Sequence, residues 1–502
     1  MKQILTNHPL HSNGLGQGGP FGCESAVRYG GTFYALLGFV VLPFVWSVPE
    51  ALVTAELGSA YPEPAGGVVW VEKAFGETAA ALAGYMTWVG GVVDNAIYPA
   101  LFLDYVHSIL GFNTVGTTRY LIVAAISIVL STVNYMGLQI VGSVLVLVCI
   151  FSMSPFILLS LFGSFKIDPS RWMQMPDPSL LPPAEVEEYT SGLLRFPNFG
   201  GVIWRPFLNN LFWNLNAFDS AANFAGEVHE PGRVFPKAMF ISLLMVFFSY
   251  IIPMLVATGA TNSSQADWTE GYLATISSQV VGNWLGGWTV LASGVSNVAL
   301  YEAEMSSDSF QLLGMAQRGM IPDIFARRSR FSTPTYGIIV GTIVVLIMNT
   351  ADFSAIVEML NFTYGISLLM EFAAFVKLRR THGNGECGLF SFSIFVSVEF
   401  LSPIWFLTVH RPYRIPLNTF GCFLFVMPPV VMTMLLMAMA STTTFIFFIA
   451  VLAFGAFAHF MRKEGKKTDI FGSNLSRATC DTCSLDDLSL EPEGNSSNGE
   501  LA

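Results

Sequence analysis

Residues 18–24, Gly18-Gly19-Pro20-Phe21-Gly22-Cys23-Glu24, combine a helix-breaking cluster with a carboxylate at the edge of a long apolar chain. Proline lacks the amide hydrogen that a helix interior needs, and glycine weakens a helix. Within a membrane, non-helical backbone is tolerated only where it is buried in protein or lines a cavity. The cluster therefore predicts an interrupted membrane helix that holds a solute at the break.

The composition places the chain among integral membrane proteins. Of the 502 residues, 53% are hydrophobic and only 12% are charged, and the mean hydropathy is +0.56. A soluble globular protein carries about 25% charged residues. We therefore expect an all-α protein with many spans whose main surroundings are the lipid bilayer. The net charge of -11 comes partly from the acidic C-terminal tail and says little about partners, and we expect no nucleic-acid partner.

Apolar stretches of about 18 to 25 residues, the length that a bilayer requires of a helix, alternate with short polar segments. The polar N-terminus 1–17 precedes a transporter domain at 18–461, in which 18–31 resembles half a span. The Ser/Asp-rich segment 462–502 is predicted to be a disordered, acidic, cytoplasmic tail. The predicted spans are 33–60, 78–107, 119–136, 139–165, 206–226, 238–260, 284–312, 335–350, 354–376, 418–438 and 443–461.

The distribution of basic residues predicts the orientation, because Lys and Arg near span ends prefer the cytoplasm. Most of the 24 Lys and Arg residues fall in one set of alternate loops, which we assign to the cytoplasm. A further apolar run, 388–409, would place the basic residues after 461 outside if it crossed the membrane. We therefore predict that 388–409 is an atypical insertion that is interfacial, re-entrant or poorly structured.

Carboxylates inside or beside the spans are the candidates for function, since charge at mid-bilayer is costly. Almost no Lys or Arg lies within a span to pair with them, so an excess of buried anions suits a cationic solute, a proton, or both. Glu50, Glu56 and Glu358 have an alternative role as wet or hydrogen-bonded groups at span ends. This alternative is favoured for Glu371, which precedes Lys377 and Arg379. The full set is Glu24, Glu50, Glu56, Asp94, Asp219, Glu302, Glu304, Asp308, Glu358 and Glu371.

Two of these carboxylates have an informative local sequence. Asp219 lies within a mid-span run of poor helix formers, 213–223, which could unwind as the first break does. Asp94 and Tyr98 are four residues apart and share one helix face, which gives a carboxylate beside an aromatic wall. The alternative for this pair is a polar helix contact with an interfacial tyrosine.

Glu304 and Asp308 have the same four-residue spacing near the cytoplasmic end of a span. Their position favours a gate or a packing network over the binding site itself. No nucleophile–base pair or metal-ligand cluster such as HExxH is present, so we expect no enzyme, cofactor or metal.

Several ordered motifs resemble one family. They are residues 18–24, 43–52 (PFVWSVPEAL), 94–99 (DNAIYP) and 304–316 (EMSSDSFQLLGMA). Together they resemble the polyamine uptake transporters of plants, algae and protists, within the amino acid–polyamine–organocation superfamily and close to the L-type amino acid transporters. The resemblance covers about residues 18–380 and 410–461. It implies about twelve spans in a five-plus-five inverted repeat whose first and sixth helices are broken at the site.

The resemblance also implies a substrate site. It makes Gly19, Pro20, Phe21 and Gly22 the first unwound segment, with Glu24 beside it. The second unwound segment would comprise Phe218, Asp219 and Ser220, following Asn216. Asp94 and Tyr98 then lie beside the cavity on the third span. Amino acid carriers hold a carboxylate on the amides of these breaks, whereas a polyamine needs anions, so Asp219 and Asp94 favour a polyamine.

The chain departs from this family in two places. The apolar half-helix that precedes the first break in relatives is absent from 1–17, so the first half of helix 1 is predicted to be missing. About thirty additional residues separate Arg380 from His410. A misplaced start and an untranslated segment read through 381–409 form one hypothesis for both departures.

The sequence also bears on the coupling ion, on protein partners and on the membrane in which the chain resides. Buried carboxylates suit proton symport, while Ser293 and Ser296 could instead contribute to a sodium site. L-type relatives tether a glycoprotein through a cysteine in a loop that corresponds to 108–118, and this segment has none, so no covalent glycoprotein subunit is expected. We expect a multi-pass protein of the plasma membrane, with an internal membrane as the alternative. The other functional hypotheses are an amino acid transporter of the same fold and a transport-inactive sensor or mis-spliced product.

Overall fold

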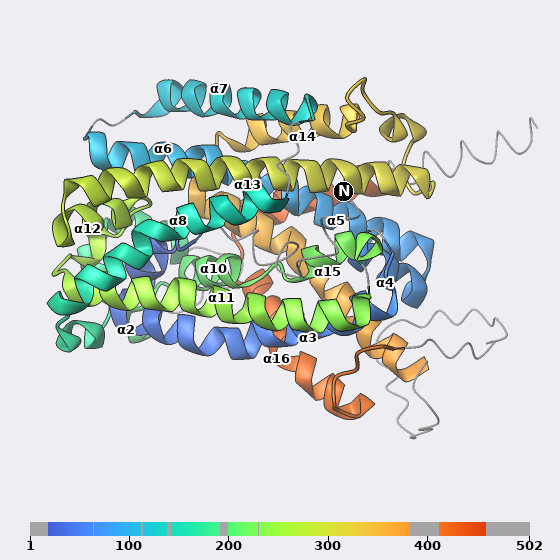
Figure 1. The fold of residues 1–502 in the computed structure, drawn as a ribbon, viewed down its shortest axis with the longest axis horizontal. Helices are drawn as coiled ribbons and strands as arrows, with labels where there is room; N and C mark the ends of the chain where they lie inside the picture. Colours follow the sequence, from blue (N-terminus) through green and yellow to red (C-terminus); the bar gives the residue numbers. More distant parts are fainter. Residues whose placement is uncertain are drawn as a thin grey trace, which may run out of the picture.

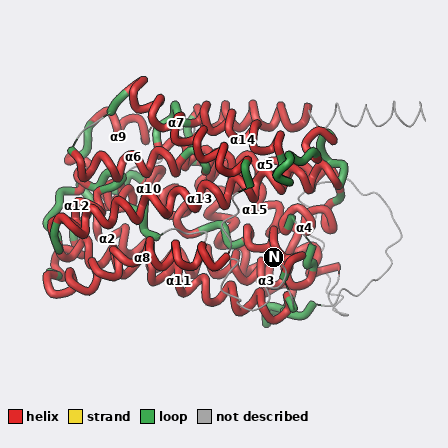
Figure 2. Tube along the Cα trace, turned by 45° about the horizontal axis from the view of Figure 1, so that its top comes forward, coloured by secondary structure: helices red, strands yellow, loops and turns green. Residues whose placement is uncertain are grey.

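The computed structural model describes residues 19–63, 65–111, 114–137, 142–190, 199–228, 230–381 and 411–457. Within these ranges the chain is helical and contains no β-strand (Figure 2). The predictions for 1–17, 388–409 and 462–502 concern residues outside this part. The helices are α2 (Glu24–Leu42), a π-helical turn (Pro43–Ser47), α3 (Val48–Ala60), α4 (Gly66–Phe75), α5 (Glu77–Asp94), α6 (Ile97–Leu110), α7 (Gly116–Tyr135), α8 (Gly142–Gly163), α9 (Pro183–Thr190), α10 (Trp204–Leu215), the 3-10 helix η6 (Asp219–Glu227), α11 (Pro231–Ala260), α12 (Tyr272–Val280), α13 (Asn283–Gln317), α14 (Thr335–Met348), α15 (Phe353–Thr381) and α16 (Thr419–Ala438).

The long helices run side by side and enclose α10 and α15 (Figure 1). In this view α13 lies on one side of α10 and α15, and α2, α3 and α11 lie on the other. In the most apolar 18-residue stretch of α15, 72% of the residues are buried, whereas in that of α7 only 28% are buried. The interior of the bundle is therefore built around α15, and α7 lies at the periphery.

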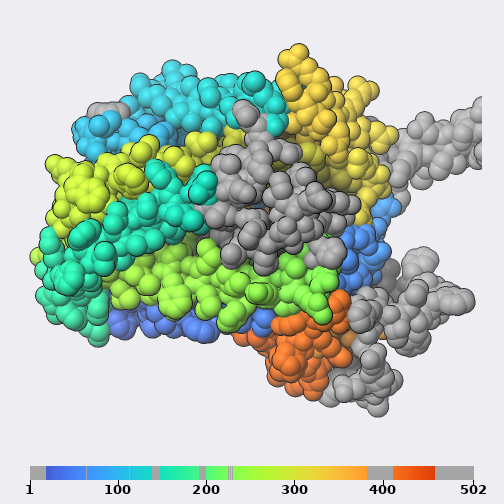
Figure 3. Space-filling view, in the orientation of Figure 1, coloured from blue at the N-terminus to red at the C-terminus, as the bar shows by residue number. Residues whose placement is uncertain are grey.

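Six helices in the described residues are long and apolar enough to cross a membrane. Helices α7, α8 and α11 also carry exposed large apolar side chains, as a lipid-facing surface requires, and α8 and α11 cover much of the face seen in Figure 3. The all-α, multi-pass prediction is confirmed. Helix α13 carries acidic residues, and the pairs α5/α6 and α10/η6 are interrupted, so length and apolarity alone do not identify them. The six are Glu24–Ala60, Gly116–Tyr135, Leu147–Lys166, Pro231–Ala260, Phe353–Thr381 and Thr419–Ala438, and the shorter apolar helices are Thr335–Met348 and Thr442–Phe457.

Two predicted helix boundaries need correction. Helix α2 begins at Glu24, and Gly31, with φ 66° and ψ 171°, bends it into a short leg and the long helix that follows. The predicted span 206–226 is not continuous, because α10 ends at Leu215 and η6 begins at Asp219. Between them Asn216 is extended and Ala217 has a φ of 71°. The unwinding agrees with the run of poor helix formers in this segment.

One end of the bundle gathers basic residues, and we call it the Arg-rich end. Arg318 forms ion pairs with Glu72 (2.8 Å) and Glu63 (3.2 Å) beside the start of α4. Arg379 at the end of α15 and Arg411, on the far side of 382–410, both pair with Glu56 of α3. The two flanks of the segment 382–410 therefore meet at one carboxylate.

Candidate functional site

The two helix breaks lie against each other. Asn210 of α10 donates a hydrogen bond from Nδ2 to the Gly22 carbonyl at 2.8 Å. Gly19 and Gly22 have φ values of 110° and 83°, which favour glycine. A β-carbon at Gly22 would lie 2.8 Å from the ring of Trp213, so the first break packs directly on the helix that leads into the second.

Asp94, Tyr98 and Glu304 form a first acidic cluster beside the breaks. The Tyr98 hydroxyl lies 3.0 Å from an Asp94 oxygen and 2.6 Å from a Glu304 oxygen. Trp213 donates its indole N–H to the other Asp94 oxygen at 2.9 Å. Asp94 and Glu304 are each partly exposed as residues. Two carboxylates on an aromatic wall can accept the hydrogen bonds of an ammonium group.

Asp308 continues this cluster one turn farther along α13. Asn95 donates to its Oδ2 at 3.3 Å, and a side chain at Gly91 would overlap its carboxylate. Sequence spacing favoured Glu304 and Asp308 as a separate gate or packing network. The structure instead joins Glu304 to Asp94 through Tyr98, because α13 packs along α5 and α6.

Glu50 and Asp219 form a second acidic cluster at the other break. Tyr364 of α15 donates to Asp219 at 2.6 Å and lies 3.1 Å from Glu50. The same Glu50 oxygen accepts the backbone N–H of Phe218 at 2.6 Å, and Trp46 donates to the other at 3.0 Å. Both carboxylates are at least 94% buried. Glu50 of α3 therefore already accepts the hydrogen bond of the Phe218 backbone amide, which lies in the break.

Glu371 lies two turns beyond Tyr364 on α15, toward the Arg-rich end. It is 3% exposed and packs over Gly67, where a side chain would overlap its carboxylate. No salt bridge or hydrogen bond reaches it from the part of the chain that the structure describes. The expectation of a wet residue near Lys377 and Arg379 is wrong: Arg379 turns to Glu56, and Lys377 lies over the Phe75 ring.

Glu24 belongs to a third group, toward the opposite end of the bundle. Its Oε1 accepts from the Tyr105 hydroxyl at 2.5 Å and lies 3.5 Å from the amide nitrogen of Leu273. Phe21 packs edge-on against Tyr105, with ring centroids 5.1 Å apart. Glu24 is therefore fully buried, between the first break and α6.

The remaining predicted residues lie in the link after α10 and on α13. Asn216 is buried in the extended link between α10 and η6. Ser293 is buried and accepts a hydrogen bond from Asn297 of its own helix at 3.0 Å, and Ser296 is also buried. No group of three His, Cys, Asp or Glu residues suited to a metal occurs within the described residues.

Other buried carboxylates are paired with arginines that lie just outside the predicted spans. Arg205 lies 2.9 Å from Glu358, and both side chains are at most 7% exposed. Glu56 is bound by Arg379 and Arg411 and accepts the Ile415 amide. These pairs connect helix ends, so Glu56 and Glu358 are structural.

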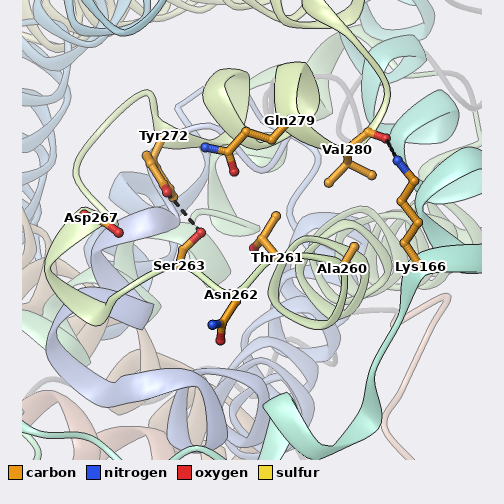
Figure 4. A pocket seen from close by; sticks show the side chains of 9 residues that line it. All are labelled: Lys166, Ala260, Thr261, Asn262, Ser263, Asp267, Tyr272, Gln279 and Val280. Atoms are coloured by element: carbon orange, nitrogen blue, oxygen red, sulfur yellow. Dashed lines mark hydrogen bonds between the residues drawn. The ribbon is translucent and has the colours of Figure 1, made fainter.

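A cavity of about 380 Å³ lies away from the two breaks, between the ends of α8, α11 and α12 (Figure 4). Tyr272 donates to Ser263 at 3.0 Å across it, and Lys166 donates to the Val280 carbonyl at 2.5 Å. Asp267 is the only carboxylate among its lining residues, and it is the last residue of the short 3-10 helix Gln265–Asp267. A surface cavity with a single exposed acid lacks the buried charge found at the breaks.

Comparison with known proteins agrees with the helical architecture of a membrane protein. The family model described as amino acid permease matches residues 16–466. This chain belongs to the amino acid permease family. The family consists of transporters, so the chain is a multi-pass membrane transporter and not an enzyme.

Three curated relatives are similar over most of their length. A probable polyamine transporter of Arabidopsis thaliana is 41% identical over 87% of this chain and 82% of its own length. The polyamine transporter RMV1 of Arabidopsis thaliana is 39% identical over 87% of this chain and 80% of its own. The polyamine transporter PUT1 of Oryza sativa subsp. japonica is 38% identical over 88% and 73%.

Several residues at the breaks were not singled out from the sequence. Tyr364, Trp213 and Tyr105 each donate to a carboxylate of the acidic groups, but an aromatic residue in an apolar helix gives no signal of its partner. The structure also places Glu50 and Glu371 near the second break. The sequence left open, or favoured, a role for these two carboxylates as wet or hydrogen-bonded groups at span ends. The signal available in the sequence was that acidic residues within the spans outnumber the basic ones.

Proposed function

We propose that this chain imports polyamines by proton-coupled alternating access, in the plasma membrane. The Asp94–Tyr98–Glu304 cluster binds an ammonium group of the substrate. The cluster of Glu50, Asp219 and Glu371 carries the coupling proton. Relatives named as polyamine transporters support this substrate class, as does the clustering of unpaired acids at both breaks.

The observation that carries the proposal is the hydrogen bond from the Phe218 amide to Glu50, at 2.6 Å. An amino acid substrate needs free amides at the break for its carboxylate. Here the amide is occupied and a negative charge stands beside it. The electrostatics therefore favour a cation that lacks a carboxylate.

The second cluster suits a proton because few donors and no described basic residue offset the charge of its three buried carboxylates. Within the described residues no Lys or Arg contacts Glu50, Asp219 or Glu371, and Tyr364 donates only to the first two. Ionising all three in a low-dielectric interior would be costly. Protonation of one of them when the substrate leaves gives a simple coupling between the two breaks.

Direct uptake tests the substrate class. Labelled putrescine and spermidine should enter cells that produce the chain, and excess leucine should not compete. Asp219→Asn should reduce uptake about 100-fold, equivalent to about 2.7 kcal/mol, while the protein stays folded. Asp177→Asn, at an exposed loop position, is the matched control and should leave uptake unchanged. Uptake of labelled leucine with no polyamine uptake would favour an amino acid carrier, and no uptake of either would favour a sensor.

Coupling is tested separately with an imposed pH gradient. An inward proton gradient should accelerate uptake, and a protonophore should abolish the acceleration. Glu371→Gln should weaken the response to the gradient while retaining exchange of polyamine across the membrane. A sodium requirement with no response to the proton gradient would contradict proton coupling and return attention to Ser293 and Ser296.

A further inference from the structure

We propose that Glu24 and Tyr105 form a second ammonium subsite, which makes this transporter prefer triamines to short diamines. The inference rests on the proposed function, in that one ammonium group is already held at the cluster of Asp94, Tyr98 and Glu304. Glu24 would receive the far terminus of a longer substrate. The two subsites lie along one face of α6.

The carboxylate of Glu24 is only partly satisfied. Its side chain is 0% exposed, and Oε1 accepts the Tyr105 hydroxyl at 2.5 Å. Oε2 is buried without a hydrogen-bond partner. No Lys or Arg contacts this carboxylate within the residues that the structure describes. An orphaned anionic oxygen in the interior is costly, and an ammonium donor would satisfy it.

The spacing of the two subsites follows from helix geometry. The Tyr98 hydroxyl lies within hydrogen-bond distance of Asp94 and Glu304, and Tyr105 donates to Glu24. The two tyrosines are seven residues apart in the helix Ile97–Leu110, so they share a face and are separated by about 10.5 Å along the axis. Two carboxylate sites are thus held at a fixed separation by a single rigid element.

That separation matches a triamine better than a four-carbon diamine. With single bonds of about 1.5 Å in an extended chain, the terminal nitrogens of a four-carbon diamine are about 6 Å apart. By the same reckoning, the termini of a triamine with three-carbon and four-carbon arms are about 11 Å apart. A diamine can reach one subsite only, whereas the triamine reaches both.

The surface between the subsites is suited to methylene groups. A β-carbon at Gly22 would lie 3.5 Å from Leu101, which lies between the two tyrosines on α6, and 2.8 Å from Trp213. Phe21 packs edge-on against Tyr105 and Phe156, with centroid distances of 5.1 and 5.0 Å. An alkyl chain lying there would contact apolar side chains and the glycine backbone of the first break.

The experiment compares substrates of different length in one variant. Uptake of labelled putrescine and spermidine is measured for the full chain and for Glu24→Gln, with surface abundance and gel-filtration profile as checks on folding. The substitution should raise the spermidine KM at least tenfold and change the putrescine KM less than twofold. Tyr105→Phe, which keeps the ring, should raise the spermidine KM severalfold. Glu270→Gln, a neighbouring acid bonded to Ser25 instead, should leave the ratio of the two KM values unchanged.

A series of unlabelled diamines tests the spacing without any substitution. Inhibition of putrescine uptake should strengthen as the diamine lengthens from four to eight carbons, and the gain should disappear in Glu24→Gln. Equal loss of putrescine and spermidine uptake in Glu24→Gln, or inhibition that does not depend on length in the unmodified chain, overturns the second subsite. Either result leaves the proposed polyamine transport intact. Failure of the unmodified chain to take up any polyamine contradicts the proposed function instead.

Discussion

Glu358 and Glu371 lie on the same helix, α15, and are about equally buried, at 5% and 3% exposure. Glu358 has Arg205 at 2.9 Å and also accepts from Ser441 and Thr444. Glu371 has no basic partner among the described residues and faces the second break. Burial alone therefore does not separate a structural acid from a functional one.

The difference shows how the bundle uses its arginines. Arg205, Arg379 and Arg411 reach the acids at the two ends of the bundle, where they join segments that are distant in sequence. Within the part of the chain that the structure describes, no arginine forms an ion pair with the acids at the breaks. Arginines therefore neutralise the acids that join helix ends, and under the proposed function the acids without a basic partner are those that bind a cation or a proton.

The largest effect is expected when each glutamate of α15 loses its charge. Glu358→Gln leaves the Arg205 guanidinium buried without a carboxylate and should cost about 3–5 kcal/mol of stability. Glu371→Gln removes an unpaired buried charge and should be neutral or stabilising. Thermal unfolding of the purified protein in detergent measures both. Equal destabilisation by the two substitutions would break the distinction between them.

The next effect concerns the acid that binds the amide of the break. Glu50→Gln keeps the size of the side chain but removes a charged acceptor from Phe218 and Tyr364. A hydrogen bond to a charged group contributes about 1.5–3 kcal/mol, so uptake should fall about tenfold to 100-fold. Uptake kinetics at equal surface abundance measure this effect. Glu63→Gln, at the exposed Arg-rich end, is the control and should change uptake less than twofold.

A smaller effect is expected from crowding Glu371 without changing its charge. The added methyl of Gly67→Ala would overlap the carboxylate and should cost about 1–3 kcal/mol or displace the side chain. We expect a weaker response of uptake to a proton gradient, in the same direction as for Glu371→Gln. Gly76→Ala is not a suitable control because φ is 89° there, whereas Gly287→Ala, a helical position with open space, is. An unchanged proton response in Gly67→Ala would separate the packing of Glu371 from its role.

The smallest effect concerns an acid at the surface opposite the Arg-rich end. Burial raises the pKa of Glu185 in α9, but hydrogen bonds from Arg28 and Tyr29, together with the Arg28 charge, outweigh it and leave the pKa below its usual value. The stabilisation is therefore fully present above the unfolded-state pKa of about 4.3 and is lost as the pH falls through the lower folded-state pKa.

Because Glu185 is partly exposed, its ion pair should contribute less than about 1 kcal/mol. Unfolding of the protein and of Glu185→Gln should differ slightly at pH 7 and converge toward pH 3. A difference that grows on acidification would contradict the sign of this pKa shift. Glu187→Gln provides the control on the same helix.

The sequence predicted the membrane class and the second helix break from local features. The high apolar content and the lengths of the apolar runs required an all-helical bundle, because backbone polar groups must be satisfied internally in lipid. Poor helix formers around Asn216 and Asp219 predicted unwinding there. The i, i+4 spacing also placed Asp94 beside Tyr98, since one helix fixes that geometry.

What the sequence could not decide was which groups meet across helices. It favoured a structural role for Glu371 more than for Glu358, whereas Glu358 is paired with an arginine 153 positions earlier in the chain and Glu371 has no basic partner among the described residues. It treated Glu304 apart from Asp94, although Tyr98 joins them. Local spacing determines which side chains share a face, because a helix has a fixed period. Only the packing of helices from distant parts of the chain decides which face meets which, and so which buried charges are compensated and which remain available to a substrate.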